Sequence, residues 1–242
     1  MSTAAAPAPP RRRGARRALR AFANALIVVG ALLLVDAGLT LVWQEPLSGL
    51  YTHFRQGSLQ HDLDRLRHQP LPPVERRAIT HLSDPGRRLA FAARAFVRQV
   101  QPGDALGRIR LPSIGVSKVM VEGTDAGQLR EGPGHYPATP LPGRPGTVAV
   151  AGHRTTYGAP FRHIDRVRPG DRVEIAMPYG DFRYRVQRTR IVAPTALWVT
   201  NRVGYDRLVL SACHPLYSAA QRIVVFARLE RAVPRGAAAR IR

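Results

Sequence analysis

An apolar segment close to the N-terminus limits how this chain can fold. Residues 22–43 read FANALIVVGALLLVDAGLTLVW, and only Asn24 and Asp36 interrupt their apolar character. About 20 consecutive apolar residues are enough for a helix to cross the hydrocarbon core of a bilayer. Trp43 at the end of the segment is typical of a membrane–water interface. The segment therefore predicts a membrane-spanning helix over residues 21–43.

The arginines before this segment predict its orientation. Residues 1–20 contain six arginines and no acidic residue. Because positive charge beside a membrane helix stays on the cytoplasmic side, we expect residues 1–20 in the cytoplasm and the remainder outside. A cleaved signal peptide is disfavoured, because the apolar run is long and no clear A-x-A cleavage site follows within residues 44–51. A buried core helix would not need the arginines, so we interpret the segment as an uncleaved signal-anchor.

Residues 44–101 have the pattern of a helical stalk or linker. A first helix is indicated by apolar residues at helical spacing, namely Leu50, Phe54, Leu59, Leu63 and Leu66. Prolines at positions 70, 72 and 73 interrupt the pattern, and a second helical stretch is predicted over residues 87–100. We expect spacer helices that pack on the following domain or on the membrane surface.

From residue 102 the chain changes to short β-rich runs separated by Gly and Pro. Strands are predicted over residues 107–111, 116–121, 147–151, 172–177, 182–192, 208–212 and 223–229. Seven or eight short strands with brief helical interruptions indicate an all-β barrel or sandwich. We expect this domain to occupy residues 102–231, and residues 232–242, rich in Ala and Arg, to form a flexible tail.

The composition suggests nucleic-acid binding, but the pattern of charge does not support it. Lys and Arg number 37 against 16 acidic residues, which gives a formal net charge of +21. Outside residues 1–20 the basic residues are spread without a dense block, and no helix-turn-helix, zinc-finger or RNP-like pattern accompanies them. Arginine scattered through strands and loops is usually a solvated surface. We expect no nucleic-acid partner.

The chain has a single cysteine, Cys213, so an internal disulfide and a cysteine-cluster zinc site are excluded. A lone cysteine is usually a small buried apolar residue. Cys213 follows the strand RLVLSA and precedes Pro215, so we expect it at the rim, where strand pairing stops. Reactive thiols need nearby positive charge. Position alone leaves an inert and a reactive thiol about equally favoured.

Two residues have positions that suit partners for the thiol. Arg222 begins the next predicted strand after the loop 214–221, so it would lie beside Cys213 if the two strands are antiparallel neighbours. Arginine keeps its charge and can hold a carbonyl or an oxyanion, although a surface arginine at a strand end is the plain alternative. His153 stands at the end of the apolar strand TVAVAG, where a histidine can face a cysteine at the rim of another strand.

The other histidines fit the partner role less well. His214 adjoins Cys213, but consecutive side chains of a strand point to opposite faces. His163 lies on a predicted short helix after Pro160 and could be a surface residue. Four histidines in the stalk are expected to be solvated, namely His53, His61, His68 and His81. No H-E-x-x-H or similar spacing occurs, so we expect no metal site.

The segments TVAVAGHRTTYGAPF and LVLSACHPLYSAAQRIVVFARL, with the cysteine 60 residues after the histidine, together resemble the sortases. These are membrane-anchored cysteine transpeptidases of Gram-positive bacteria. The runs GRIRLPSIGVSKVMVEGT and GPGHYPATPLPGRPG are similar to the early strands and the pre-histidine loop of that family. The resemblance covers residues 103–229. It is greatest to the actinobacterial class E enzymes, with class D second, and it implies an eight-stranded barrel.

The resemblance implies a role for each of the three residues. Cys213 matches the nucleophile that attacks the Thr–Gly carbonyl of an LPXTG-like or LAXTG-like C-terminal sorting motif. His153 matches the histidine that protonates the leaving amine and then activates the incoming one. Arg222 matches the arginine that binds the substrate backbone and stabilises the oxyanion. Many sortases have Thr before the cysteine, where this chain has Ala212, so substrate preference is left open.

The resemblance also implies the partners of the chain. These are secreted proteins that carry a sorting motif, with a cell-wall precursor or pilin amine as acceptor, and hydrolysis when no amine is present. We expect a monomer without a cofactor, and no metal, because the acidic calcium site of some class A enzymes has no match here. The alternative function is a non-catalytic, membrane-anchored β-barrel that binds wall polymer or a partner protein, with a cysteine protease between the two.

Overall fold

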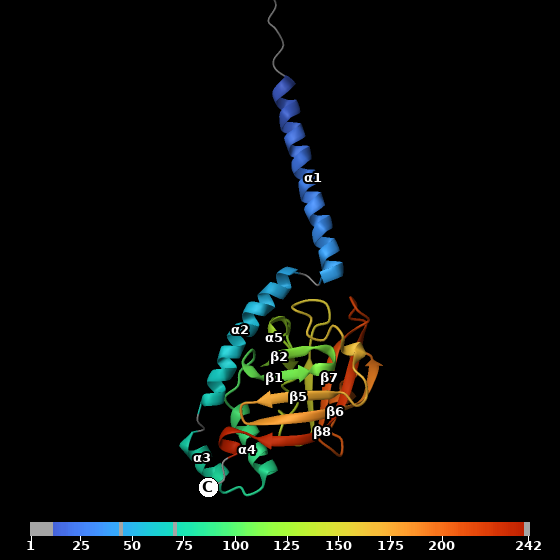
Figure 1. The fold of residues 1–242 in the computed structure, drawn as a ribbon. Helices are drawn as coiled ribbons and strands as arrows, with labels where there is room; N and C mark the ends of the chain where they lie inside the picture. The colour runs from blue at the N-terminus through green and yellow to red at the C-terminus, as the bar shows by residue number, and fades with distance from the viewer. Residues whose placement is uncertain (1–11, 44–45, 70–71, 240–242) are drawn as a thin grey trace, which may run out of the picture. The chain divides into compact units, whose positions relative to one another are not determined.

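The computed structural model describes residues 12–43, 46–69 and 72–239, and the chain divides into two compact units, residues 1–45 and 46–242 (Figure 1). In its described part, residues 12–43, the first unit is one helix, α1 (Arg12–Trp43). Its segment Arg16–Gly38 has a mean hydropathy of 2.2 and is not buried at all. By length and composition, this helix is able to cross a membrane, which is consistent with either an anchor or a signal sequence.

Four helices of the second unit lie before or between the strands. They are α2 (Pro46–His68), α3 (Pro73–Thr80), α4 (Pro85–Val97) and α5 (Ala126–Glu131). Helix α4 begins at a cap in which the Asp84 Oδ1 accepts a hydrogen bond of 2.6 Å from the Arg87 backbone N–H. The sequence predicted α2 and α4. It did not predict α3, whose eight residues begin at Pro73, because proline interrupts a helix but is well tolerated in its first turn.

Within residues 72–239, eight strands close into a barrel (Figure 1). The strands are β1 (Ala105–Leu111), β2 (Val116–Glu122), β3 (Gly134–His135), β4 (Thr147–Ala151), β5 (Arg172–Met177), β6 (Gly180–Val192), β7 (Arg207–His214) and β8 (Gln221–Pro234). Their order around the barrel is β1-β2-β3-β4-β7-β8-β6-β5, and β5 pairs with β1 to close it. All seven predicted strands are present. Only β3, which is two residues long, was missed.

The helices share apolar cores with the barrel. Leu89, Ala92 and Ala93 of α4 belong to the same buried cluster as the residues that fill the barrel. Leu59 and Leu63 of α2 pack on the outside of β1 and β2, in a second cluster with Ala105, Val119 and Val121. The stalk helices were expected to pack on the following domain or on the membrane surface. The structure shows them packed on the barrel.

The prediction of a loose tail is wrong for the described part of residues 232–242. Strand β8 continues to Pro234, and a short 3-10 helix, η4 (Gly236–Ala238), follows it. Ala238 is fully buried, and its carbonyl accepts a hydrogen bond of 2.8 Å from the Nε of Arg88. The buried Ala238 side chain and the hydrogen bond from Arg88 therefore hold this segment on the domain, although its Ala-rich and Arg-rich composition suggested a solvated end.

Truncation of Leu63 to alanine should destabilise the second unit by about 2–5 kcal/mol, because its side chain is fully buried between α2 and the barrel. Leu50→Ala on the same helix is the matched control, since 54% of Leu50 is exposed and its loss should cost no more than about 0.5 kcal/mol. Chemical unfolding followed by circular dichroism measures both. Equal stability of the two variants would show that α2 does not depend on this contact.

Candidate active site

The candidate site is built where β4 and β7 run side by side. These strands are parallel neighbours, and Ala151 pairs with Ser211 at their ends. The backbone N–H of Gly152 donates to the Ser211 carbonyl at 3.0 Å, so the contact continues one residue further. His153 and Cys213 each lie two residues beyond this pair. Both residues therefore lie at the same end of this strand pair, with Cys213 still on β7 and His153 in the segment that follows β4.

Arg222 lies on the other side of the cysteine. Strands β7 and β8 are antiparallel, and Cys213 pairs directly with Arg222. The order β4-β7-β8 thus places Cys213 and Arg222 on neighbouring strands, and His153 two residues after the end of β4, which pairs with β7 on its other side. One expectation needs correction: strand pairing does not stop before the cysteine, because β7 continues through His214, which pairs with Gln221.

Cys213 and Arg222 lie on the outer face of the barrel wall. Leu208, Leu210 and Ala212 of β7 point into the barrel interior. The alternate positions form a separate apolar cluster on the outer face, made of Ala149, Val209, Val224 and Phe226. Cys213 and Arg222 continue these outer rows, and both are half-buried, as is His153. A thiol here is accessible to a substrate laid across the outside of the sheet.

The loop after His153 is held by the first turns of α2. The His153 ring packs at 5.3 Å from the ring of Tyr157, measured between centroids. Tyr157 has a positive φ of 52°, and its backbone N–H donates to the Oγ of Ser48 at 3.1 Å. Arg130 lies over the same ring at 5.6 Å from its centroid. The stalk helix thus contacts the segment that carries His153, which nothing in the sequence indicated.

The guanidinium of Arg222 is bound to the turn between β7 and β8. Its Nη1 donates to the carbonyls of Ala219, at 2.9 Å, and of Gln221, at 3.0 Å. These bonds use one of the two terminal nitrogens of the fork. The arginine is therefore oriented by its own turn at the edge of the strand that faces Cys213.

A buried arginine that the sequence analysis did not single out lies on the opposite side of the same strands. Arg154 is 4% exposed, and its Nη1 is 3.4 Å from both the Cys213 carbonyl oxygen and the Nδ1 of His214. His214 thus faces away from the thiol, as strand alternation predicted. The same alternation, applied to the residue after His153, was the signal that could have located Arg154.

The remaining histidines do not join this site. Those of the stalk, His53, His61, His68 and His81, are exposed, as expected. His163 precedes the 3-10 helix η2 (Ile164–Arg166), and its pKa is lowered by burial and by the charges of Arg166 and Arg162. His135, which the sequence analysis left without a role, is buried with its Nδ1 2.8 Å from the Oε2 of Glu122.

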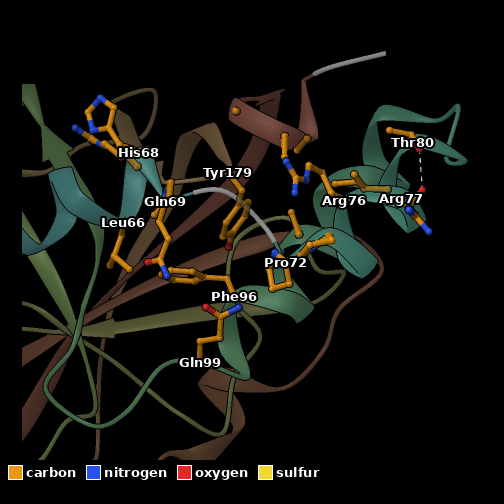
Figure 2. A pocket seen from close by; sticks show the side chains of 18 residues that line it. Leu66, His68, Gln69, Pro72, Arg76, Arg77, Thr80, Phe96, Gln99 and Tyr179 are labelled. Atoms are coloured by element: carbon orange, nitrogen blue, oxygen red, sulfur yellow. Dashed lines mark hydrogen bonds between the residues drawn. The ribbon is translucent and has the colours of Figure 1, made fainter. Parts of the chain in front are cut away.

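A cavity of about 930 Å³ lies elsewhere, among the end of α2, α3, α4 and η4 (Figure 2). Phe96, Tyr179 and Pro72 contribute to its lining, with Arg76 and Arg77 from α3. Cys213, His153 and Arg222 do not line this cavity, which is therefore separate from the candidate site.

A thiol flanked by a histidine and an arginine on a closed β-barrel has the residue types of a cysteine-dependent acyl-transfer site. Comparison with known proteins gives the same class. The sortase domain model matches residues 109–230, half of the chain. This chain belongs to the sortase family, and its barrel is the eight-stranded sortase barrel.

Two curated relatives and one solved structure define the similarity. Sortase D of Bacillus subtilis is 31% identical over 133 residues, which cover 53% of this chain and 65% of that protein. Sortase SrtE1 of Streptomyces coelicolor is 26% identical over 151 residues, covering 56% and 43%. The structure of sortase E from Streptomyces avermitilis is 32% identical with a TM-score of 0.51, covering 58% and 99%. The match thus spans less than two thirds of either curated relative.

Proposed function

We propose that this chain is a sortase transpeptidase that cleaves the Thr–Gly bond of an LPXTG-like or LAXTG-like sorting motif through a thioacyl intermediate on Cys213. The observation that supports it most is that Cys213 on β7 pairs with Arg222 on β8, while His153 follows the end of β4, the other neighbour of β7. Relatives of both class D and class E match the chain, so the proposal concerns the reaction and does not choose between the classes.

In the first half-reaction, the Cys213 sulfur attacks the threonine carbonyl carbon and an S–C bond forms. The carbonyl electrons move onto oxygen, and Arg222 stabilises this oxyanion with its charge and its N–H donors. When the C–N bond breaks, His153 gives a proton to the glycine nitrogen, which leaves as an amine. A positive histidine and arginine beside the sulfur also favour the thiolate form that attacks.

In the second half-reaction, an incoming amine attacks the thioester carbonyl and His153 takes its proton. A new amide forms, and the S–C bond breaks to return the thiol. Water in place of the amine gives slow hydrolysis. Cell-wall precursors and pilins carry suitable amines, and secreted proteins with a C-terminal sorting motif are the proposed acyl donors.

We also propose that α1 anchors the enzyme, with residues 1–20 in the cytoplasm and the barrel outside the cell. Support comes from the apolar length of α1 and from the arginines that precede its apolar segment. The proposed division is a basic segment to residue 20, an anchor at 21–43, helices at 44–101 and the catalytic barrel at 102–231. A lone thiol suits an extracellular enzyme, because it has no internal partner for a disulfide.

Amine capture tests the proposal directly. The full chain in detergent micelles is mixed with LPXTG-type or LAXTG-type peptides, with and without triglycine, and products are identified by mass. We expect the triglycine adduct of the truncated peptide to form faster than the hydrolysis product. Hydrolysis alone at saturating triglycine would indicate a cysteine protease, and salt-sensitive binding without cleavage would indicate the non-catalytic alternative.

A further inference from the structure

We infer that Arg154 is a positioning residue that fixes the end of the Cys213 strand against the loop that carries His153. The inference rests on the proposed function, because it assigns Arg154 a part in aligning the thiol and the imidazole. Arg154 extends from the opposite face of the strands, so it acts through the backbone and not on the substrate.

The contacts of Arg154 join three pieces of chain. Its Nη1 lies 3.4 Å from the Cys213 carbonyl and 3.4 Å from His214 Nδ1. Its Nε and Nη2 donate to the Arg162 carbonyl at 3.3 and 3.2 Å. Its Nη2 also lies 3.2 Å from Asp165 Oδ1. Each of these distances is at or beyond the long end of the usual hydrogen-bond range. The connection between the segments therefore depends on all the nitrogens of the guanidinium together.

The loop between these contacts is closed by its own backbone. The Phe161 N–H donates to the His153 carbonyl at 2.9 Å, which brings the two ends of residues 153–161 together. Arg154 then ties the far end of this loop, through Arg162, to the carbonyl of Cys213. Because adjacent Cα atoms are about 3.8 Å apart, a fixed Arg154 backbone leaves His153 little freedom to move relative to the thiol.

The burial of Arg154 supports a role beyond general stability. The side chain is 4% exposed, whereas Asp165, its ion-pair partner, is 51% exposed. Burying a guanidinium whose ion-pair partner is half-exposed has a large desolvation cost. A packed apolar side chain in its place often gives a fold that is equally stable. The charge also lies directly behind the strand end where the thiolate and the oxyanion form, with a sign that favours both.

Arg88 provides the matched control. It is also buried, at 3% exposed, and donates to the carbonyls of Ala238, Leu82 and Ser83. These lie at the α4 end of the unit and have no contact with the candidate site. Arg88→Met and Arg154→Met therefore remove comparable buried hydrogen bonds, and their thermal stabilities show what such a loss costs the fold.

The test measures peptide turnover and Cys213 alkylation by iodoacetamide in the full chain. In Arg154→Met we expect kcat to fall about 10- to 100-fold with little change in KM, as a small misplacement of reacting groups would cause. Alkylation should slow about tenfold, because a charge that favours the thiolate is lost. Arg154→Lys keeps the positive charge but lacks the planar guanidinium with its several donors. Relative to Arg154→Met, it should restore the alkylation rate more than kcat.

Two outcomes would overturn the inference. In the first, Arg154→Met and Arg88→Met lose the same amount of Tm and also have the same kcat and the same alkylation rate. Arg154 would then have only a structural role. The other, decisive if Arg154→Met does not fold, is an Arg154→Lys protein with the kcat of the unchanged enzyme. If the unchanged enzyme does not turn over any peptide, the proposed function fails, and the alkylation rates alone then decide whether Arg154 organises the thiol.

Discussion

Replacement of Cys213 by alanine should abolish both turnover of a sorting-motif peptide and formation of the thioacyl intermediate. In the proposed mechanism the sulfur is the attacking atom, and among the described residues no other cysteine exists to replace it. The side chain is half-buried at the end of β7, so the loss of one sulfur atom should change the Tm little. Product mass and calorimetry check the two parts of this prediction.

Cys213→Ser is the companion variant. It keeps the size and polarity of the side chain but offers a hydroxyl, which is far less ionised than a thiol near neutral pH. We expect its turnover to be as low as that of the alanine variant. Substantial turnover by Cys213→Ala would place the nucleophile elsewhere and would remove the basis of the proposed mechanism.

The second large effect is expected at the neighbours of the thiol. His153→Ala should lower kcat/KM by about 10²- to 10⁴-fold, because proton transfer to the leaving amine is lost. Arg222→Ala should lower it by about 10²- to 10³-fold, because the oxyanion loses a charged donor. The double variant should be far less impaired than the product of the two losses, since the groups act as one unit. Peptide kinetics on single and double variants measure this.

Matched controls separate these effects from a general loss of charge. Arg228 lies on β8 as Arg222 does, but it pairs with Arg207 at the opposite end of β7, and its guanidinium stacks over the Tyr205 ring at 4.9 Å from the centroid. His163 lies outside the site. Arg228→Ala and His163→Ala should keep turnover within about twofold of the unchanged enzyme, in line with ordinary surface substitutions. If they lost as much activity as the site variants, the assignment of Arg222 and His153 would be wrong.

The barrel was predictable because its strands are long enough to show a pattern. Seven of them carry β-branched runs bounded by Gly and Pro, and the structure has all seven. Strand β3 has two residues, Gly134 and His135, and is defined only by its neighbours β2 and β4. So short a strand has no periodicity of its own, and pairing partners far apart in sequence are not visible in a local pattern.

One neighbour relation at the candidate site was predictable from strand ends. The sequence predicted that Arg222 lies beside Cys213, and the register of β7 and β8 pairs the two residues directly. The roles of His153, Cys213 and Arg222 stay a prediction. The contact between α2 and the loop after His153 could not be predicted, because it joins Ser48 to Tyr157 across 109 positions. Such contacts depend on the closed barrel, which composition and spacing do not determine.

The role of the arginines was the feature that the sequence alone explained least. Scattered arginines were interpreted as solvated surface, but among the described residues three are buried, namely Arg88, Arg154 and Arg207. Each donates to a backbone carbonyl outside the strands, namely that of Ala238 for Arg88, Arg162 for Arg154 and Val199 for Arg207. The guanidinium has five N–H donors and can therefore bind several carbonyl oxygens at once. No sequence pattern distinguishes these buried arginines from the exposed ones. Part of the net charge of +21 therefore fastens loops, including the one at the site.

The central claim is that Cys213 becomes acylated, and intact mass after mixing with peptide tests it most directly. The full chain in detergent micelles is mixed with an LPXTG-type or LAXTG-type peptide in the absence of amine and quenched with acid. The account predicts a mass increase equal to the peptide fragment ending at threonine, located on Cys213 by peptide mapping and absent from Cys213→Ala. Cleavage of the peptide without any adduct on Cys213, or an adduct that persists in Cys213→Ala, would contradict it.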